Sequence, residues 1–450
     1  MNRSIKKILC QLTFLLSATT FIGAYRINVH AADYSSDGAL KVSGVGLASS
    51  KTGQKVILRG VSTHGINWDV AYPYISTEAY STLKTKYSVD AIRLAMYTTE
   101  YFGYCDKGGA GESQSEVQKI LKERIDTGVK AATANNMYVI IDWHILNDQN
   151  PNKYKSQAKK FFEEISKKYA GYDNVLYEIC NEPNGGTSWA DITKYAKEII
   201  PVIRKNAPQS IIIVGTPTWS QDVDVAAESP LPYDNVMYTL HFYSATHKQS
   251  YRDKLKKAID KGLPIMVTEY GLSEASGDGG LDKAEAKKWL DMLDANGISY
   301  FVWSLSNKAE SSALLKAGTT KKSGWATSDL SDEGKWVFEQ YKNRSGAIAT
   351  TETDKSTVPS KVTGLKLKRV KGKKIKVTYG AVPDASGYQI RYSYNKKFKK
   401  AKNLSVTTNS ATLKKLKKNK KCYVKVRAYK MVGNVKKFGK YSIAKSVKVK

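Results

Sequence analysis

The chain has 450 residues, of which 41% are hydrophobic and 10% aromatic. This composition supplies enough apolar surface for a folded core and excludes a largely disordered or collagen-like protein, and the length favours a catalytic-sized domain with a smaller module. The formal net charge is +31, but residues 351–450 alone contain 30 Lys and Arg against 3 Asp and Glu, a net charge of +27. The basic character therefore belongs to the C-terminal segment and does not describe the chemistry upstream.

The first 32 residues have the pattern of a secretory signal peptide. Three basic residues lie within the first seven positions, an apolar stretch follows, and Ala31-Ala32 offers small residues for cleavage. We therefore expect a secreted, extracellular protein, with an uncleaved membrane anchor as the alternative. The four cysteines are too few and too scattered for a disulfide framework or a zinc site.

Eight short apolar runs are predicted to be strands, and most are separated by amphipathic helical stretches. The runs are VILRGVST (56–63), AIRLAMY (91–97), YVIIDWH (138–144), VLYEICNE (175–182), IIIVGTP (211–217), VMYTLHFY (236–243), PIMVTEYG (264–271) and ISYFVWSL (298–305). This alternation predicts a (β/α)8 TIM barrel over residues 37–344. A doubly wound open sheet is disfavoured, because neither a GxGxxG nor a GxxxxGK[ST] phosphate-binding turn occurs.

In such a barrel the active-site residues gather where the strands end. The candidates at or near these positions are His64, Trp68, Arg93, His144, Asn181, Glu182, Trp219, His241, Tyr243, Glu269 and Trp303. Glu182 and Glu269 are expected to face each other across the barrel mouth. A carboxyl pair suits hydrolysis of a glycosidic bond, in which one group is protonated and the other ionised. No compact ligand set suggests a metal, and no cofactor is expected.

The same positions resemble a known family. The residues of the resemblance are Asn181-Glu182-Pro183, His241-Phe242-Tyr243, Glu269 and Arg93, which are similar to glycoside hydrolase family 5, clan A. The stretches GVSTHGINW (60–68), DWHIL (142–146), GTPTWSQDV (215–223) and VWSLSNKAESSALL (302–315) resemble bacterial endo-β-1,4-glucanases of that family. The resemblance implies a retaining cellulase that hydrolyses internal β-1,4 bonds of cellulose or β-glucan by double displacement.

The resemblance also implies a role for each residue. Glu182, in the Asn-Glu-Pro triplet, corresponds to the acid/base, and Glu269 to the nucleophile. Arg93 is expected to bind Glu269 and lower its pKa, Tyr243 to orient Glu269, and Asn181 to bond the sugar 2-hydroxyl.

The remaining candidates are expected to contact the sugar chain. His64, His144 and His241 are expected to bind sugar hydroxyls or to tune Glu182. The three tryptophans Trp68, Trp219 and Trp303 are expected to stack on sugar rings. Lys308 and Glu310 resemble positions along the glycone side of the groove, and a solvated loop is the alternative for these two residues.

Residues 345–358 are polar and predict a linker, which Pro359 ends. Period-two runs such as GYQIRYS and CYVKVRAYK then predict a small all-β sandwich over residues 359–450. These runs resemble fibronectin type III repeats, with two departures: Tyr379 replaces the usual buried Trp, and Cys422 replaces the corner tyrosine. The module is interpreted either as a solvated spacer or as an anchor to an anionic cell-wall polymer, and nucleic-acid binding is not expected.

Two alternative functions stay open on the sequence. A mannanase or mixed-linkage β-glucanase of the same family would differ in only a few groove contacts. A non-catalytic cell-surface carbohydrate-binding protein is the alternative outside enzymes, although both glutamates are present. The expected partner is a β-1,4-glucan polysaccharide, and we expect a monomer.

Overall fold

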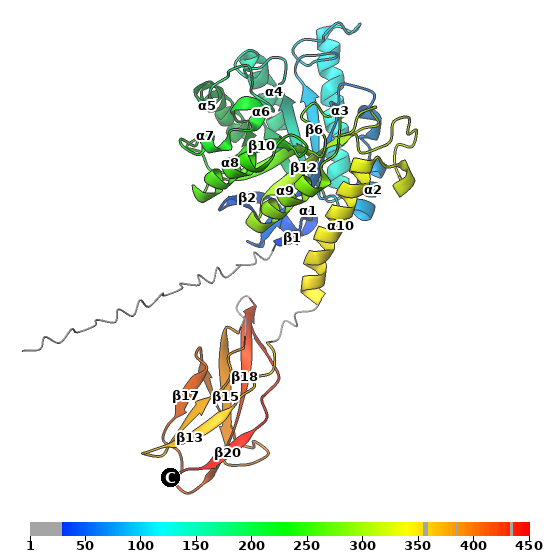
Figure 1. Ribbon diagram of the computed structural model, residues 1–450. Helices are drawn as coiled ribbons and strands as arrows, with labels where there is room; N and C mark the ends of the chain where they lie inside the picture. Colours follow the sequence, from blue (N-terminus) through cyan, green and yellow to red (C-terminus); the bar gives the residue numbers. More distant parts are fainter. Residues whose placement is uncertain (1–28, 354–358, 383–384, 433–434) are drawn as a thin grey trace, which may run out of the picture. The chain divides into compact units, whose positions relative to one another are not determined.

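The computed structural model describes residues 29–353, 359–382, 385–432 and 435–450, and the chain divides into two compact units between Gly346 and Ala347 (Figure 1). The first unit is a closed barrel of eight parallel strands, in the order β10-β11-β12-β5-β6-β7-β8-β9, which confirms the predicted fold. The strands are β5 (Arg59–Thr63), β6 (Ala91–Tyr97), β7 (Tyr138–His144), β8 (Val175–Glu178), β9 (Ile212–Val214), β10 (Val236–Tyr243), β11 (Ile265–Gly271) and β12 (Ser299–Leu305).

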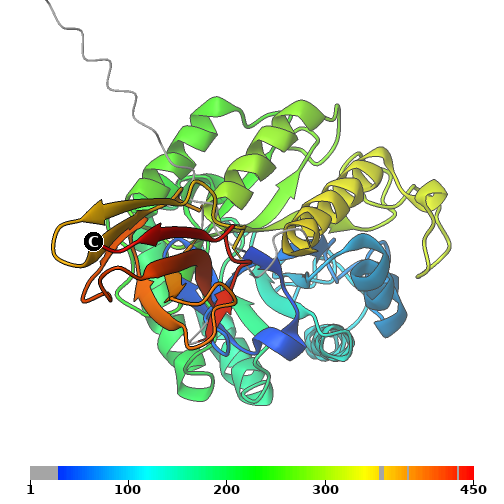
Figure 2. The same ribbon diagram turned by 90° about the horizontal axis from the view of Figure 1, so that it is seen from below.

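Burial on both faces explains why these strands are nearly continuous apolar runs. Every residue of β6, β7, β11 and β12 is buried, as in parallel strands covered outside by helices and packed together inside. The helices lie around the outside of the barrel (Figure 2). They are α2 (Thr77–Tyr87), α3 (Gln114–Ala134), α4 (Lys155–Lys168), α5 (Trp189–Asn206), α6 (Pro217–Ser220), α7 (Val223–Ala226), α8 (Gln249–Asp260), α9 (Lys283–Asn296) and α10 (Asp332–Thr353).

Serine side chains mark the start of three of these helices. Ser76, Ser113 and Ser188 each accept a hydrogen bond from a backbone N–H in the first turn of α2, α3 and α5. These bonds satisfy donors that a helix start leaves unpaired. Local sequence thus fixes where the strand-to-helix loops end, and those loops form the rim of the barrel mouth.

A small sheet closes the end of the barrel at which the strands begin. Its strands lie side by side in the order β1 (Val29–Ala31), β4 (Lys55–Ile57), β3 (Gly46–Ser49) and β2 (Leu40–Ser43). The short helix α1 (Tyr34–Asp37) lies between β1 and β2 in the sequence. The apolar side chains of this sheet form one cluster with residues near the start of the barrel strands, including Met237, Met266 and Phe301. The opposite end of the barrel is therefore the end that is open for a site.

Two predicted boundaries fall partly outside the described residues. Residues 1–28 of the predicted signal peptide are not described, and its residues Val29–Ala31 form β1, parallel to β4. Helix α10 covers the predicted linker as far as Thr353, and residues 354–358 lie outside the described part. None of the described helices has the length and apolarity that a membrane span requires.

The second unit contains two antiparallel sheets, which agrees with the predicted all-β sandwich. One sheet is formed by β13 (Lys366–Val370), β14 (Lys374–Thr378) and β17 (Ser410–Leu413), and the other by β16 (Lys402–Val406), β15 (Gly387–Ser393), β18 (Lys421–Val432), β19 (Val435–Phe438) and β20 (Lys445–Lys448). Tyr379 and Cys422 are both buried in its core, and the Tyr379 hydroxyl donates to the Thr408 carbonyl at 3.1 Å. The fibronectin type III resemblance of this unit stays a prediction.

Candidate active site

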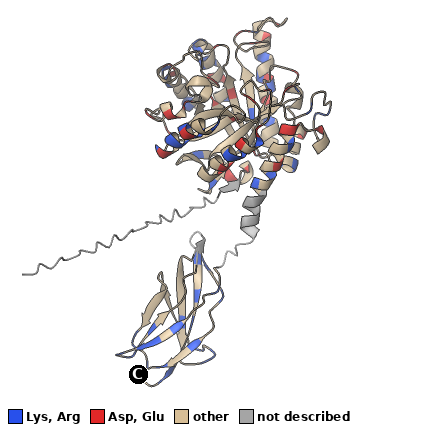
Figure 3. Ribbon diagram, viewed as in Figure 1, with Lys and Arg blue, Asp and Glu red and all other residues tan. Residues whose placement is uncertain are grey.

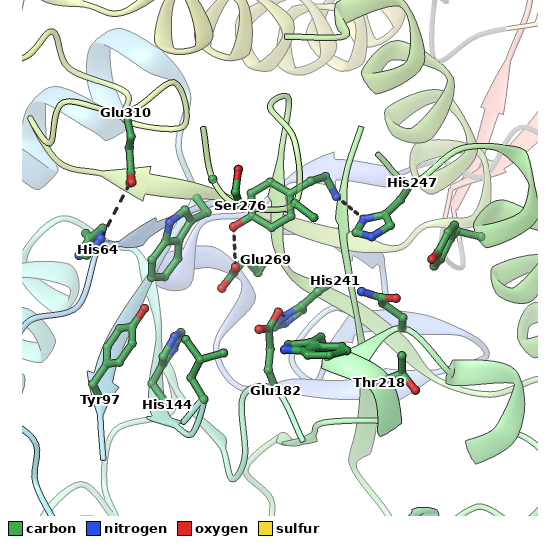
Figure 4. A pocket seen from close by; sticks show the side chains of 18 of the residues that line it. His64, Tyr97, His144, Glu182, Thr218, His241, His247, Glu269, Ser276 and Glu310 are labelled. Carbon is green, nitrogen blue, oxygen red and sulfur yellow. Dashed lines mark hydrogen bonds and ion pairs between the residues drawn. The ribbon is translucent and has the colours of Figure 1, made fainter. Parts of the chain in front are cut away.

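A cleft of about 660 Å³ lies at the ends of the barrel strands (Figure 4). Its lining includes ten of the predicted residues: His64, His144, Glu182, Trp219, His241, Tyr243, Glu269, Trp303, Lys308 and Glu310. Trp68 lines an adjoining hollow of about 810 Å³, which shares His64 and Lys308 with the cleft. Arg93 and Asn181 are fully buried and do not line either space. The structure therefore brings all the predicted residues to one end of the barrel.

The two glutamates face each other in the cleft. A carboxyl oxygen of Glu182, one of Glu269 and a ring nitrogen of His241 all lie within 4.8 Å of one another. Glu269 accepts the Tyr243 hydroxyl at 2.7 Å on one oxygen and Arg93 Nη1 at 3.1 Å on the other. Glu182 Oε1 instead lies 2.9 Å from His241 Nδ1. Two donors stabilise an ionised Glu269, and Glu182 has no comparable pair.

The pKa values of the two carboxyl groups follow from burial and charge. Burial raises the pKa of Glu182 to about 8. It also raises the pKa of Glu269 to about 7, with the charge of Glu182 adding to the rise and His241, Arg93 and Tyr243 opposing it. Arg93 lowers the pKa of Glu269 as predicted, but burial outweighs this contribution, so the pKa is raised overall. The hydrogen bonds that Glu269 accepts from Tyr243 and Arg93 favour its ionised form and leave the proton to Glu182.

Arg93, on β6, is shared among several acidic groups. Its guanidinium donates to both oxygens of Glu178, at 2.8 and 3.1 Å, and pairs with Asp142 at 3.0 Å. It also donates to the side-chain oxygen of Asn181, Oδ1, at 2.6 Å. The sequence analysis missed Glu178 and Asp142. The signal for them was a charged residue inside an apolar strand, since such residues are rarely buried without a partner.

His144 and Asn181 are bonded to protein groups below the cleft. His144 Nδ1 lies 2.6 Å from Asp142 Oδ2, and the Asn181 amide nitrogen lies 3.2 Å from His144 Nε2 and donates to the Ile145 carbonyl at 3.1 Å. Because the amide nitrogen of Asn181 can only donate, His144 Nε2 is the acceptor, and His144 Nδ1 carries the proton. His144 thus holds Asn181 in place, and the sugar contact of Asn181 stays a prediction.

Aromatic side chains form much of the cleft wall. Trp303 lies over the His144 ring at 5.4 Å between centroids, with the planes 21° apart. The centroid of the Tyr97 ring lies 4.0 Å from that of His144 and 4.7 Å from that of Trp68. Trp219 is 45% exposed and follows β9. The sequence analysis did not identify Tyr97. It is the last residue of β6 and lies four residues after Arg93, so the alternation of the strand places both side chains on the same face.

Lys308 and Glu310 line the cleft as an ion pair, with 2.6 Å between Nζ and Oε2. Glu310 also approaches His64 Nε2 at 3.9 Å (Figure 4). The Nδ1 atom of His64 is buried and has no hydrogen-bond partner among the described residues. This side of the cleft therefore combines charged groups with a free ring nitrogen.

The lining also contains residues of the strand-to-helix loops and of helices α6 and α8 that were not predicted as site residues. They are Leu146, Thr218, Gln221, His247, Tyr251 and residues 275–277. Most have no distinctive motif, and only their position after a strand end could have indicated them. His247 Nδ1 accepts the backbone N–H of Tyr243 at 2.8 Å, so it helps to fix the strand that presents Tyr243 (Figure 4).

Among the described residues, the group with the spacing to hold a metal ion is Glu182, His241 and Glu269. Glu182 is already bonded to His241, and Glu269 is already bonded to Tyr243 and Arg93. A fixed guanidinium thus supplies positive charge beside the carboxylates. This arrangement fits acid–base and nucleophilic chemistry by the side chains themselves.

Comparison with known proteins agrees with this chemistry. Residues 49–309 match the family described as Cellulase (glycosyl hydrolase family 5). An endoglucanase of Clostridium saccharobutylicum is 47% identical over 339 residues, which is 75% of this chain and 72% of that protein. Endoglucanase A of Butyrivibrio fibrisolvens is 49% identical over 305 residues, 67% of this chain and 68% of that protein.

A solved structure is also similar. It is a catalytic-domain variant of a Thermobifida fusca endoglucanase in complex with cellotetraose, with 35% identity and a TM-score of 0.62. The similarity covers 69% of this chain and 99% of that one. The comparison of folds and the comparison of sequences therefore both find endoglucanases.

Proposed function

The chain belongs to glycosyl hydrolase family 5, and from this premise we propose that it is a retaining endo-β-1,4-glucanase acting on cellulose or β-glucan. The observation that supports retention is the approach of Glu182 and Glu269, whose oxygens come within 4.8 Å. Carboxyl groups about 5–5.5 Å apart are typical of retaining enzymes, whereas inverting enzymes need about 6.5–9.5 Å to admit a water.

Two steps follow from this geometry. In the first, Glu269 attacks the anomeric carbon, the bond to the leaving oxygen breaks, and Glu182 gives that oxygen its proton. In the second, Glu182 takes a proton from water, whose oxygen attacks the same carbon and releases Glu269. Tyr243 and Arg93 hold Glu269 in place for the attack.

Two measurements test this function. Release of reducing sugar from carboxymethylcellulose, barley β-glucan and galactomannan, measured side by side, should favour the two glucans. Galactomannan as the best substrate would instead support the mannanase alternative. Proton NMR of the first products of cello-oligosaccharide hydrolysis should show the β-anomer, and an α-anomer would contradict retention.

We also propose that the protein is secreted, on the basis of the basic and apolar pattern of its first 32 residues. The mature N-terminus, determined by mass spectrometry of protein from the culture medium, tests this. Cleavage after Ala32 would remove β1, whereas cleavage before Val29 would keep it paired to β4. Recovery only from the membrane fraction, with residues 1–28 intact, would support the anchor.

For the C-terminal module we propose an acidic cell-wall polysaccharide as the partner. Residues 359–450 contain a single acidic residue, Asp384, and the ribbon of this module shows many basic positions (Figure 3). Arg391 and Lys425 lie directly opposite each other on β15 and β18, which is unfavourable for like charges. A bound carboxylate would relieve this repulsion.

Aromatic rings lie against the basic side chains of β18 on the face of the sheet that carries Arg391 and Lys425. Arg427 lies 3.8 Å from the Phe438 ring centroid, and Lys425 lies 4.3 Å from that of Tyr441. Ring faces used in this way are not free to stack on a neutral sugar. The face therefore fits the charged groups of a polyuronate better than the apolar faces of a glucan.

A further inference from the structure

A chain of buried hydrogen bonds joins Glu182 to Glu178. Glu182 Oε1 lies 2.9 Å from His241 Nδ1, and His241 Nε2 lies 2.9 Å from Thr268 Oγ1. Thr268 Oγ1 in turn lies 2.8 Å from Glu178 Oε1. His241, Thr268 and Glu178 are buried and lie on β10, β11 and β8. Each of these bonds needs one donor and one acceptor from the two side chains that it joins.

The donor and the acceptor of each bond can be assigned by starting from Glu178. Both of its oxygens accept N–H groups of Arg93, in the two-pronged geometry of an ionised carboxylate. Burial raises the pKa of Glu178, and the contact with Arg93 opposes that rise. An ionised carboxylate only accepts hydrogen bonds, so the Thr268 hydroxyl donates to it.

The Thr268 hydroxyl has one hydrogen, and Glu178 uses it. Its remaining contacts, to His241 Nε2 and to Thr239 Oγ1 at 2.5 Å, must therefore be accepted by its lone pairs. Thr239 can be the donor, because its own oxygen accepts the Thr268 backbone N–H at 3.2 Å. His241 Nε2 must then carry a hydrogen.

His241 is a neutral ring with its lone pair on Nδ1. Burial and Arg93 lower its pKa, to about 4, although Glu269 and Glu178 oppose the shift. With the hydrogen on Nε2, Nδ1 can only accept, and the partner facing it is Glu182. The bond at 2.9 Å therefore needs a protonated Glu182, whereas Glu269 receives only donors.

We propose that Thr268 and Glu178 are positioning residues that fix the tautomer of His241 and thereby hold the proton on Glu182. The inference rests on the proposed function and deepens it, since it says why the two glutamates have different roles. After Glu182 has given its proton to the leaving oxygen, its carboxylate faces the lone pair of Nδ1. This contact favours its taking a proton from water in the second step.

Other groups also act on this pair. The charged and titratable side chains around Glu182 and His241 are Arg93, Tyr97, Asp142, His144, Glu178, Tyr243 and Glu269. None of them bonds to His241 Nε2 at the 2.9 Å of Thr268, and the nearest is Glu178 Oε1 at 3.9 Å. The tautomer is therefore set through the Thr268 hydroxyl.

The wild-type protein allows a direct test. The chain has five histidines, so the ring nitrogens of His241 can be assigned in a nitrogen-15 NMR spectrum by comparison with a His241→Gln variant. We expect a neutral ring with the hydrogen on Nε2 between about pH 6 and 8. A ring with the hydrogen on Nδ1, or a doubly protonated ring, would overturn the inference. The result does not depend on stereochemistry, so it is separate from a failure of the retaining mechanism.

Kinetics give a second test. Thr268→Val removes the hydroxyl at nearly constant volume and should move the alkaline limb of kcat/KM to lower pH by about one unit. It should lower kcat/KM on cellotetraose about 10- to 100-fold. Formation of the glycosyl-enzyme from dinitrophenyl cellobioside, which needs no acid, should stay within about threefold. Thr268→Ser should restore the wild-type profile.

The matched control is Thr239→Val, which also deletes a threonine hydroxyl. The Thr239 hydroxyl contacts Thr268 and is thus one hydrogen bond further from His241. The variant leaves the bonds from His241 to Thr268 and from Thr268 to Glu178 in place, so the alkaline limb should not move. An equal loss on both substrates in Thr268→Val, with an unmoved alkaline limb, would mean that Thr268 has only a structural role.

Discussion

The barrel and the C-terminal module use positive charge in opposite ways. In the barrel, the fully buried guanidinium of Arg93 has Asp142, Glu178 and Glu269 within hydrogen-bond distance. In the module, Arg391 and Lys425 lie directly opposite each other on neighbouring strands, and neither is in an ion pair with a described residue. Buried charge pairs set protonation states and are little screened by salt, whereas exposed charge acts over longer distances and is screened. Catalysis and retention on a polymer should therefore respond differently to the same changes.

The largest expected effect is loss of the buried nucleophile. Glu269→Ala should lower activity on all glucans by orders of magnitude, because the variant lacks the carboxylate that forms the glycosyl-enzyme. Added azide should restore turnover and give a product of inverted configuration. The measurement is the rate and the anomeric form of the glycosyl azide.

The matched variant is Glu182→Ala, which removes the proton donor and leaves the nucleophile. Dinitrophenyl cellobioside should still form the glycosyl-enzyme, and azide should then give a product of retained configuration. If the two variants gave the opposite stereochemistries, the roles of the two glutamates would be reversed.

The next effect is on pH dependence. Activity needs Glu269 ionised and so should fall as the pH drops through about 7, and it needs Glu182 protonated and so should fall as the pH rises through about 8. We expect a narrow bell in kcat/KM between these values. The bell should stay in place when NaCl is raised to 0.5 M, because the groups are buried. A maximum near pH 5 would show that Arg93 and Tyr243 outweigh the effect of burial on the Glu269 pKa.

A smaller effect is expected at the rim of the cleft. Trp219→Ala should lower kcat/KM on cellotetraose about threefold to tenfold, since an aromatic contact is lost. Its melting temperature should hardly change, because Trp219 is 45% exposed. Trp289→Ala is the control: this ring is fully buried against Phe242, and its loss should destabilise the fold by about 3–5 kcal/mol. A large fall in the melting temperature of Trp219→Ala would show that it packs the fold.

The fold was predictable from sequence because burial on both faces leaves long apolar runs. β6, β7 and β10 have the predicted ends, whereas β8 stops at Glu178, before the predicted residue 182. Beyond Glu178 the backbone N–H groups of Ile179 and Asn181 still donate to the carbonyls of Ile213 on β9 and Trp143 on β7. The Asn181 and Glu182 side chains bond to Arg93 and His241. These side-chain bonds are a property of the assembled site, which a local pattern does not contain.

The site was predictable in its members but not in its connections. The motif identified Glu182 and Glu269, whereas the relation between Glu178, Thr268 and His241 depends on three strands that the barrel brings together. The overall rise of the Glu269 pKa, which outweighs the predicted effect of Arg93, has the same origin. A sequence shows that an arginine is near, but only the structure shows that burial is complete and that the arginine is shared with Glu178 and Asp142.

The smallest effect on catalysis, and the clearest contrast with the barrel, is expected in the module. The triple variant Arg391→Gln, Lys425→Gln, Arg427→Gln should leave turnover of cellotetraose within about twofold. Retention of the full chain on immobilised polygalacturonate should weaken, because the cations that lie together on β15 and β18 are lost. The control removes the same charge from the exposed loop after β17, as Lys414→Gln, Lys415→Gln, Lys418→Gln. Equal weakening in both variants would mean that only net charge matters, and salt-independent retention of the wild type would exclude an electrostatic contact.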